Sequence, residues 1–250
     1  MTIYVFSEGK TEELVLKGIK KRLLPDLNLI FPAGEGKDQV NAGEGKDQVN
    51  HKMVTKLAPH LQSGDPIRCL VLRDLDEHVG ETVAGIVQGV SDAVRKMVHE
   101  RTSAPPAVAL SRRPDFASVY TLALPRPDLR LALHVATHRW KAEFIKATID
   151  DYVLSLAVQP TTASALVAKK EWPVAADDVL RKVTTEIPGL LASNGIPMQE
   201  AKDYVRLYAA VIQEHTSPPV FASRAMDHAN EVDLRRILAP LLAAIEFLRS

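Results

Sequence analysis

Two apolar runs that each lead into acidic residues constrain the fold of this chain most strongly. Residues 3–6 are apolar and lead into Ser7-Glu8-Gly9, and residues 67–72 are apolar at nearly every position and lead into Arg73-Asp74-Leu75-Asp76. A run of this kind is typical of a strand that is covered by helices on both faces of a parallel sheet. Because parallel strands end at one rim, the two runs predict carboxylates gathered at a shared edge.

The segments around these runs alternate between helical and strand patterns. Helical spacing is expected over residues 10–24, 51–61 and 83–100, and further strands are expected over residues 27–31, 107–110 and 129–135. Alternation of this kind predicts an α/β fold with a mostly parallel sheet flanked by helices. We expect this sheet domain to occupy residues 1–138.

The remaining residues, 139–250, have helical periodicity and no strand pattern. The expected helices cover residues 140–156, 161–169, 175–186, 199–213 and 225–248, with loops at Pro188-Gly189, residues 194–197 and residues 217–219. Proline and glycine pairs are strong turn signals, which sets these loop positions. The sequence therefore predicts a C-terminal, all-helical lobe.

A nine-residue segment, residues 33–41, is repeated without change as residues 42–50. Nine residues make two and a half helical turns, so an insertion of this length inside a helix would rotate the following apolar face away from the core. We therefore expect the repeat to lie in a loop, where insertions cost little. It is either a tolerated duplication, which we favour, or an enlarged lip that carries Lys37 and Lys46 toward a substrate.

The residues at the two strand ends resemble a known family. Ser7-Glu8-Gly9-Lys10-Thr11-Glu12 and Asp74-Leu75-Asp76 are similar to the two signatures of the Toprim domain, most closely that of the OLD-type nucleases and their small stand-alone relatives, many of which occur in phage-defence settings. The resemblance covers the first domain at the level of motifs. It implies hydrolysis of DNA or RNA phosphodiesters with one or two Mg²⁺ (or Mn²⁺) ions held by Glu8, Asp74 and Asp76.

The chemistry of these residues agrees with that implication. Side chains two apart on an extended strand point the same way, so Asp74 and Asp76 could share one ion. Mg²⁺ is usually held by one or two carboxylates and keeps waters for substrate phosphates. By the resemblance, Glu12 is a candidate ligand of a second metal, and Glu143 is a candidate at the opening of the second lobe. Each could instead be an acid favoured by the dipole of a helix N-terminus.

Charge composition does not by itself indicate a nucleic-acid-binding protein. The chain has 31 basic and 31 acidic side chains, so no net positive charge attracts phosphate. A bound cation would supply positive charge at the reacting phosphate. The candidate nucleic-acid contacts are Lys10, Lys37, Lys46, Arg112 and Arg113.

Three other functions compete with the nuclease. The segment ending in Asp74-Leu75-Asp76 could be the nucleophile motif of a haloacid-dehalogenase-like phosphatase, but that motif is normally followed by Gly-Thr and lies on the first strand. A phosphate-binding loop would need Ser or Thr after Gly-Lys, where Asp38 and Asp47 stand. The third is a non-catalytic Toprim module that docks an ATPase partner. Formation of a homodimer is also open.

The cellular setting is expected to be the cytoplasm. The single cysteine, Cys69, excludes a disulfide framework, and no apolar stretch approaches the length of a membrane span. The N-terminus has a strand pattern in place of a signal peptide. We therefore expect a nucleic-acid substrate as the partner and no membrane.

Overall fold

A six-stranded sheet forms the centre of the protein. The computed structural model describes residues 1–32, 45–100, 107–168, 174–214 and 216–250. The strand order is β2-β1-β3-β6-β5-β4. The strands are β1 (Thr2–Phe6), β2 (Asn28–Ile30), β3 (Ile67–Arg73), β4 (Ser111–Arg112), β5 (Val119–Pro125) and β6 (Asp128–Val135). Strands β2, β1, β3 and β6 are parallel, and β5 and β4 continue the sheet in antiparallel pairing. The α/β class and the mostly parallel sheet are thus confirmed.

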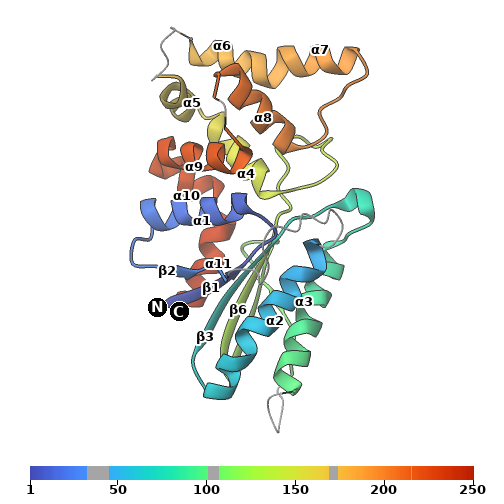
Figure 1. Ribbon diagram of the computed structural model, residues 1–250, viewed down its shortest axis with the longest axis vertical. Helices are drawn as coiled ribbons and strands as arrows, with labels where there is room; N and C mark the ends of the chain where they lie inside the picture. Colours follow the sequence, from blue (N-terminus) through green and yellow to red (C-terminus); the bar gives the residue numbers. More distant parts are fainter. Residues whose placement is uncertain (33–44, 101–106, 169–173, 215) are drawn as a thin grey trace.

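Helices cover both faces of this sheet (Figure 1). One face packs against α2 (Gly45–Ser63) and α3 (Val83–His99), and the other against α1 (Lys10–Arg22) and α11 (Ala239–Arg249). Alternate residues of β3 divide between the two buried clusters: Cys69 and Val71 face one side, Leu70 and Leu72 the other. This burial explains why the third strand is apolar at nearly every position.

The region after β6 is helical, as expected. Its helical segments are α4 (Ile149–Ala157), α5 (Pro160–Val167), α6 (Ala176–Arg181), the π-helical turn η2 (Lys182–Glu186), α7 (Ile187–Ser193), α8 (Ala201–Val211), α9 (Pro218–His228) and α10 (Glu231–Ile237). Helix α9 packs along α1, and the chain then returns so that α11 lies on β6, β5 and β3. One buried cluster therefore joins the sheet to the C-terminal helices. The division at residue 138 stays a prediction, but the packing across it is continuous.

Several expected boundaries are wrong for identifiable reasons. The end of the repeat, residues 45–50, belongs to α2 and not to a loop, because Val49 is buried in the core beneath that helix. The strand expected over residues 107–110 is displaced to the two residues of β4. Strand β5 forms a hairpin with β6. It was not predicted, because its buried and exposed residues do not alternate strictly.

The helical region also departs from expectation at its start and at its prolines. The helix expected from residue 140 begins at Ile149, because Ala147 is held in an extended bridge with Leu75. Pro188-Gly189 does not form a loop: a π-helical turn precedes it, and the helix continues. Likewise Pro218 begins α9, where its missing N–H is not needed. The loop at residues 194–197 is confirmed.

A close approach between α1 and α9 depends on Gly18. A Cβ atom built on Gly18 would lie 2.8 Å from Cβ of Met226. We expect Gly18→Ala to lower the free energy of unfolding by about 1–3 kcal/mol through overpacking, despite alanine's better helix propensity. Gly89→Ala in α3 is the matched control, because its Cβ would meet only Asn50 Nδ2 at 3.5 Å. That change should stabilise by about 0.5–1 kcal/mol. Urea unfolding measures both, and a stabilised Gly18→Ala would contradict the packing argument.

The buried His134 makes stability depend on pH. His134 Nε2 lies 3.2 Å from the hydroxyl of Tyr152, and burial lowers the pKa of His134 to about 4. The unfolded chain therefore gains a proton below about pH 6.5 that the folded chain does not take up until about pH 4. Stability contributed by neutral His134 is present above pH 6.5 and is lost on acidification.

The test compares the wild type with His134→Gln. We expect the difference in unfolding free energy between them to shift in favour of the variant by about 2 kcal/mol between pH 7.5 and pH 4.5. Because both proteins share every other titrating group, the difference isolates His134. Parallel stability curves over this range would contradict the assignment.

Candidate functional site

The structure places the predicted acids at one rim of the sheet. Strands β1 and β3 are parallel neighbours, with Phe6 opposite Val71. Glu8 follows the end of β1 by two residues, and Asp74 directly follows β3. Both carboxylates therefore lie beyond the carboxyl ends of adjacent strands, which is where ligands gather in open parallel sheets.

Arg73, the last residue of β3, pairs with two of the carboxylates at this rim. Its side chain is only 5% exposed; Nε donates to Glu8 Oε1 at 2.7 Å, and Nη2 donates to Glu81 Oε1 at 3.3 Å. The other oxygen of Glu81 accepts from the backbone N–H of Asp76 at 3.0 Å. Arg73 thus balances Glu8 and fixes the turn that follows β3.

Gly9 matters to the site because it has no side chain. The φ of Gly9, −150°, is extended and open to any residue, so the turn does not require glycine for its backbone conformation. A Cβ atom there would lie 3.1 Å from Glu12 Oε2. The glycine therefore leaves room for the Glu12 carboxyl in the first turn of α1.

Glu12 faces inward, toward the other acids. It is only 5% exposed. Burial, with added repulsion from the carboxylates of Asp150 and Glu8, raises the pKa of Glu12 to about 7. An acid placed only to favour a helix dipole would be solvated. Glu12 is therefore not a solvated acid at the start of α1.

Asp74 connects the sheet to the helical region. Its Oδ1 accepts from the backbone N–H of Ile149 at 3.2 Å, and the next residue, Leu75, forms an antiparallel bridge with Ala147. Burial, and then the nearby charges of Glu12, Glu8 and Asp150, raise the pKa of Asp74 well above its usual range.

Asp150 is a site residue that sequence reasoning missed. It lies in the first turn of α4 and is 6% exposed, and its buried Oδ1 has no hydrogen-bond partner among the described residues. Burial, offset in part by Lys202, raises the pKa of Asp150 to about 6, with contributions from Asp151 and Glu200. The available signal was Thr148 before an acid pair, a helix-start pattern. Because a helix was expected from residue 140 onward, this helix-start signal at Thr148 was not recognised.

A second group of charges borders the first. Lys146 Nζ pairs with Glu200 Oε2 at 2.5 Å. Burial lowers the pKa of Lys146, but the hydrogen bond to Glu200 and the charges of Asp76 and Asp74 outweigh burial, so the pKa of Lys146 is raised. Asp76 and Asp74 thus both lie near Lys146, and Asp74 is also close enough to Glu12, Glu8 and Asp150 for their charges to affect it.

Glu143 was expected to open the first helix of the second lobe, but it lies in the loop before α4. Its side chain is 68% exposed, and its nearest cation is Lys141 Nζ at 3.9 Å. The helix starts later, at Ile149, so Asp150 occupies the helix-opening position that Glu143 was expected to hold. The structure does not bring Glu143 into the buried group of acids.

The candidate nucleic-acid contacts are scattered. Lys10 pairs with Glu13 at 2.6 Å, near Glu8 in sequence. Arg112 is exposed on edge strand β4, three strands from β3, which is about 14 Å across the sheet. Arg113 is turned inward and donates to the carbonyl of Ala243 at 3.4 Å. Lys37 lies outside the described residues, and Lys46 falls in α2 at a position whose side chain is not described.

The carboxylate oxygens at the rim are ligands that suit a hard divalent ion, but they do not form a complete coordination shell. Within the described residues, no three acidic, histidine or cysteine side chains are grouped closely enough to hold a metal. Glu8 is held by Arg73 and Asp74 by an N–H of α4. In contrast, Asp150 Oδ1 is buried without a partner. The chemistry of the donor set fits Mg²⁺, and binding would require Glu8 to exchange Arg73 for the ion.

Comparisons with known proteins add no identification. No family model, curated protein or solved structure matches the chain. Over the part of the chain that the structure describes, the helices are all too short or too polar to cross a membrane. The geometry at the rim of the sheet is therefore the basis for any functional assignment.

The two arginines of β3 provide a matched test of the buried ion pairs. Arg73→Ala leaves Glu8 and Glu81 without their partner, so we expect a loss of about 3–5 kcal/mol in the free energy of unfolding. Arg68 lies at the other end of the strand and pairs with Asp128, which is 45% exposed. Arg68→Ala should cost no more than about 1 kcal/mol. Guanidinium unfolding distinguishes the two, and equal losses would contradict a special role for Arg73.

Proposed function

We propose that this protein is a Mg²⁺-dependent nuclease of the Toprim type, which hydrolyses phosphodiester bonds of DNA or RNA. The observation that carries the proposal is the group formed by Glu8, Glu12, Asp74 and Asp150. These carboxyls come from three segments of the chain, residues 8–12, 74 and 150, and influence one another electrostatically near the carboxyl rim of a parallel sheet, where three of them have raised pKa values. Buried like charges are costly unless a cation or protons compensate them.

Each residue then has a distinct role. Asp74, Glu12 and Asp150 would hold the metal, and Glu8 would join them after leaving Arg73. Mg²⁺, when bound, supplies electrostatic stabilisation of a phosphoryl oxygen and lowers the pKa of a bound water. Lys146 lies beside Asp76 and Glu200, where its ammonium would position a substrate phosphate. Arg73, released from Glu8, would keep Glu81 as its partner.

Removal of one buried acid should raise stability in the absence of metal and weaken the stabilisation that Mg²⁺ gives. In metal-free buffer at pH 8, we expect Glu12→Gln to stabilise by about 1–2 kcal/mol, because a buried like charge is removed. The same change should reduce the rise in melting temperature that Mg²⁺ gives the wild type. Glu13→Gln is the neighbouring control: Glu13 pairs with Lys10 and Lys17, so its loss should be slightly destabilising and leave the Mg²⁺ effect intact. Calorimetric melting measures both.

Catalysis is tested with plasmid and single-stranded RNA substrates in Mg²⁺, Mn²⁺ or EDTA. We expect cleavage with either ion, none in EDTA, and a fall of at least about 100-fold for Asp74→Ala and Asp150→Ala. Glu143→Ala, at an exposed position, should retain activity. Equal rates for the wild type and Asp74→Ala would rule out the nuclease assignment.

The absence of a finished metal group among the described residues favours one alternative, a non-catalytic Toprim module that docks a partner such as an ATPase. In that case protons would neutralise the buried acids. Mg²⁺ would then have no effect on the melting temperature at pH 8, and Asp74→Asn would stabilise the protein without loss of any measured function. Calorimetry with and without Mg²⁺ therefore separates the two functions.

A further inference from the structure

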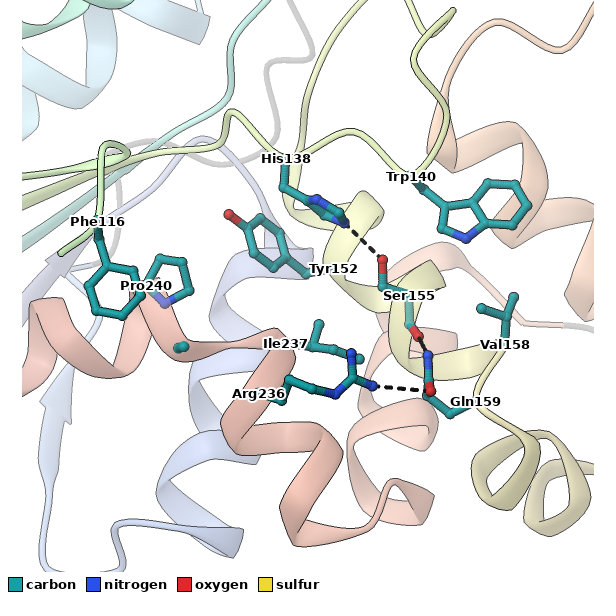
Figure 2. A pocket seen from close by; sticks show the side chains of 11 residues that line it. Phe116, His138, Trp140, Tyr152, Ser155, Val158, Gln159, Arg236, Ile237 and Pro240 are labelled. Carbon is teal, nitrogen blue, oxygen red and sulfur yellow. Dashed lines mark hydrogen bonds between the residues drawn. The ribbon is translucent and has the colours of Figure 1, made fainter.

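A cavity of about 420 Å³ lies apart from the acidic rim. It is bounded by α4, by the loop after β6, by the turn before β5 and by the junction of α10 and α11 (Figure 2). Helix α4 separates it from the acids, because Tyr152 and Ser155 face the cavity while Asp150 is rotated about 200° from Tyr152. The volume lies within the range of about 300–1,000 Å³ that is usual for small-ligand sites.

Aromatic rings line this cavity on several sides. Phe116, Trp140 and Tyr152 come from three different segments, and the imidazole of His138 lies 5.2 Å from the ring of Tyr152. Figure 2 shows Trp140 and His138 along one edge and Phe116 with Pro240 at another. Tyr152 is only 2% exposed, so the half-buried Phe116 and Trp140 provide the flat apolar surfaces on which a planar heterocycle can stack.

The polar groups of the lining are basic or neutral. His138 Nε2 is 3.0 Å from Ser155 Oγ, and Arg236 Nη2 donates to Gln159 Oε1 at 3.1 Å. Arg236 Nη2 also pairs with Asp233 at 2.7 Å, while its Nη1 and Nε make no hydrogen bond within the described residues. The lining residues themselves include no carboxylate. An arginine with donors to spare beside aromatic rings is suited to a phosphate on an aromatic ligand.

We propose that this cavity binds a nucleotide, with the base at Phe116 or Trp140 and the phosphate at Arg236. The ligand is either a free mononucleotide or the terminal nucleotide of a single strand, since both present the same base and phosphate. The site is separate from the acidic rim and requires no metal. Its occupancy therefore does not depend on the nuclease proposal.

The experiment uses the fluorescence of Trp140. The chain contains two tryptophans, so the Trp172→Phe background leaves Trp140 as the only one. We expect saturable quenching by AMP in EDTA, where metal at the acidic rim is excluded, and binding at least about tenfold weaker for adenosine because the phosphate contact is lost. Inorganic phosphate alone should not quench, since it has no ring to stack on Trp140.

Variants of two neighbouring arginines test whether the phosphate binds at Arg236. Arg236→Gln should weaken AMP binding about tenfold and leave adenosine unchanged. Arg235→Gln is the control, because Arg235 pairs with Glu231 at 2.8 Å and does not line the cavity. Arg236 is 58% exposed, so its replacement should leave the fold intact, which thermal melting checks. A second variant, Ala239→Phe, should fill the cavity and abolish quenching by both ligands.

A 5′-phosphorylated pentaadenylate identifies the source of the nucleotide. If AMP and the oligonucleotide both quench, or if only the oligonucleotide does, the site is supported, and the second result makes a strand end the natural ligand. Absence of saturable quenching by every nucleotide would overturn the proposal. Equal AMP affinity in the wild type and Arg236→Gln would also overturn it.

Discussion

The short bridge between Leu75 and Ala147 is the contact on which the site depends. It holds the chain that leaves β3 against the chain that enters α4, and Asp74 then accepts from the N–H of Ile149. These bonds place the first turn of α4, with Asp150, beside the ends of β1 and β3. Without these bonds, only the acids that follow β1 and β3 would lie at the rim, and the helical region would not place Asp150 there.

Charge at this rim is balanced in two ways. Glu8 has a buried guanidinium partner, Arg73, whereas Glu12, Asp74 and Asp150 are buried near other acids and have raised pKa values. The surplus negative charge can be neutralised by protons or by a divalent ion. An ion would also attract Glu8, so Arg73 and the metal compete for one carboxylate. Under the proposed function, this competition would explain why these donors do not form a complete coordination shell.

The sequence was informative where local pattern decides structure. The apolar runs predicted the positions of β1 and β3, and hence of Glu8 and Asp74, because strands that are buried on both faces are apolar at nearly every position. Asp150 could not be found in this way, since its place at the rim comes from the pairing of Leu75 with Ala147, which are far apart in the chain. The packing of α11 on the sheet is equally non-local. Glu143 was misplaced because helical periodicity does not reveal that an extended bridge delays the start of a helix.

Helix α4 lies between the two proposed sites. Its first turn carries Asp150 to the acidic rim, and its opposite face presents Tyr152 and Ser155 to the aromatic cavity. The start of this helix is held firmly: Asp151 accepts from the N–H groups of both Trp140 and Thr148, at 2.9 Å and 2.8 Å. Trp140 itself lines the cavity. A ligand that moves Trp140 would therefore act on the hydrogen bonds that orient the N-terminus of α4, and through them on the position of Asp150.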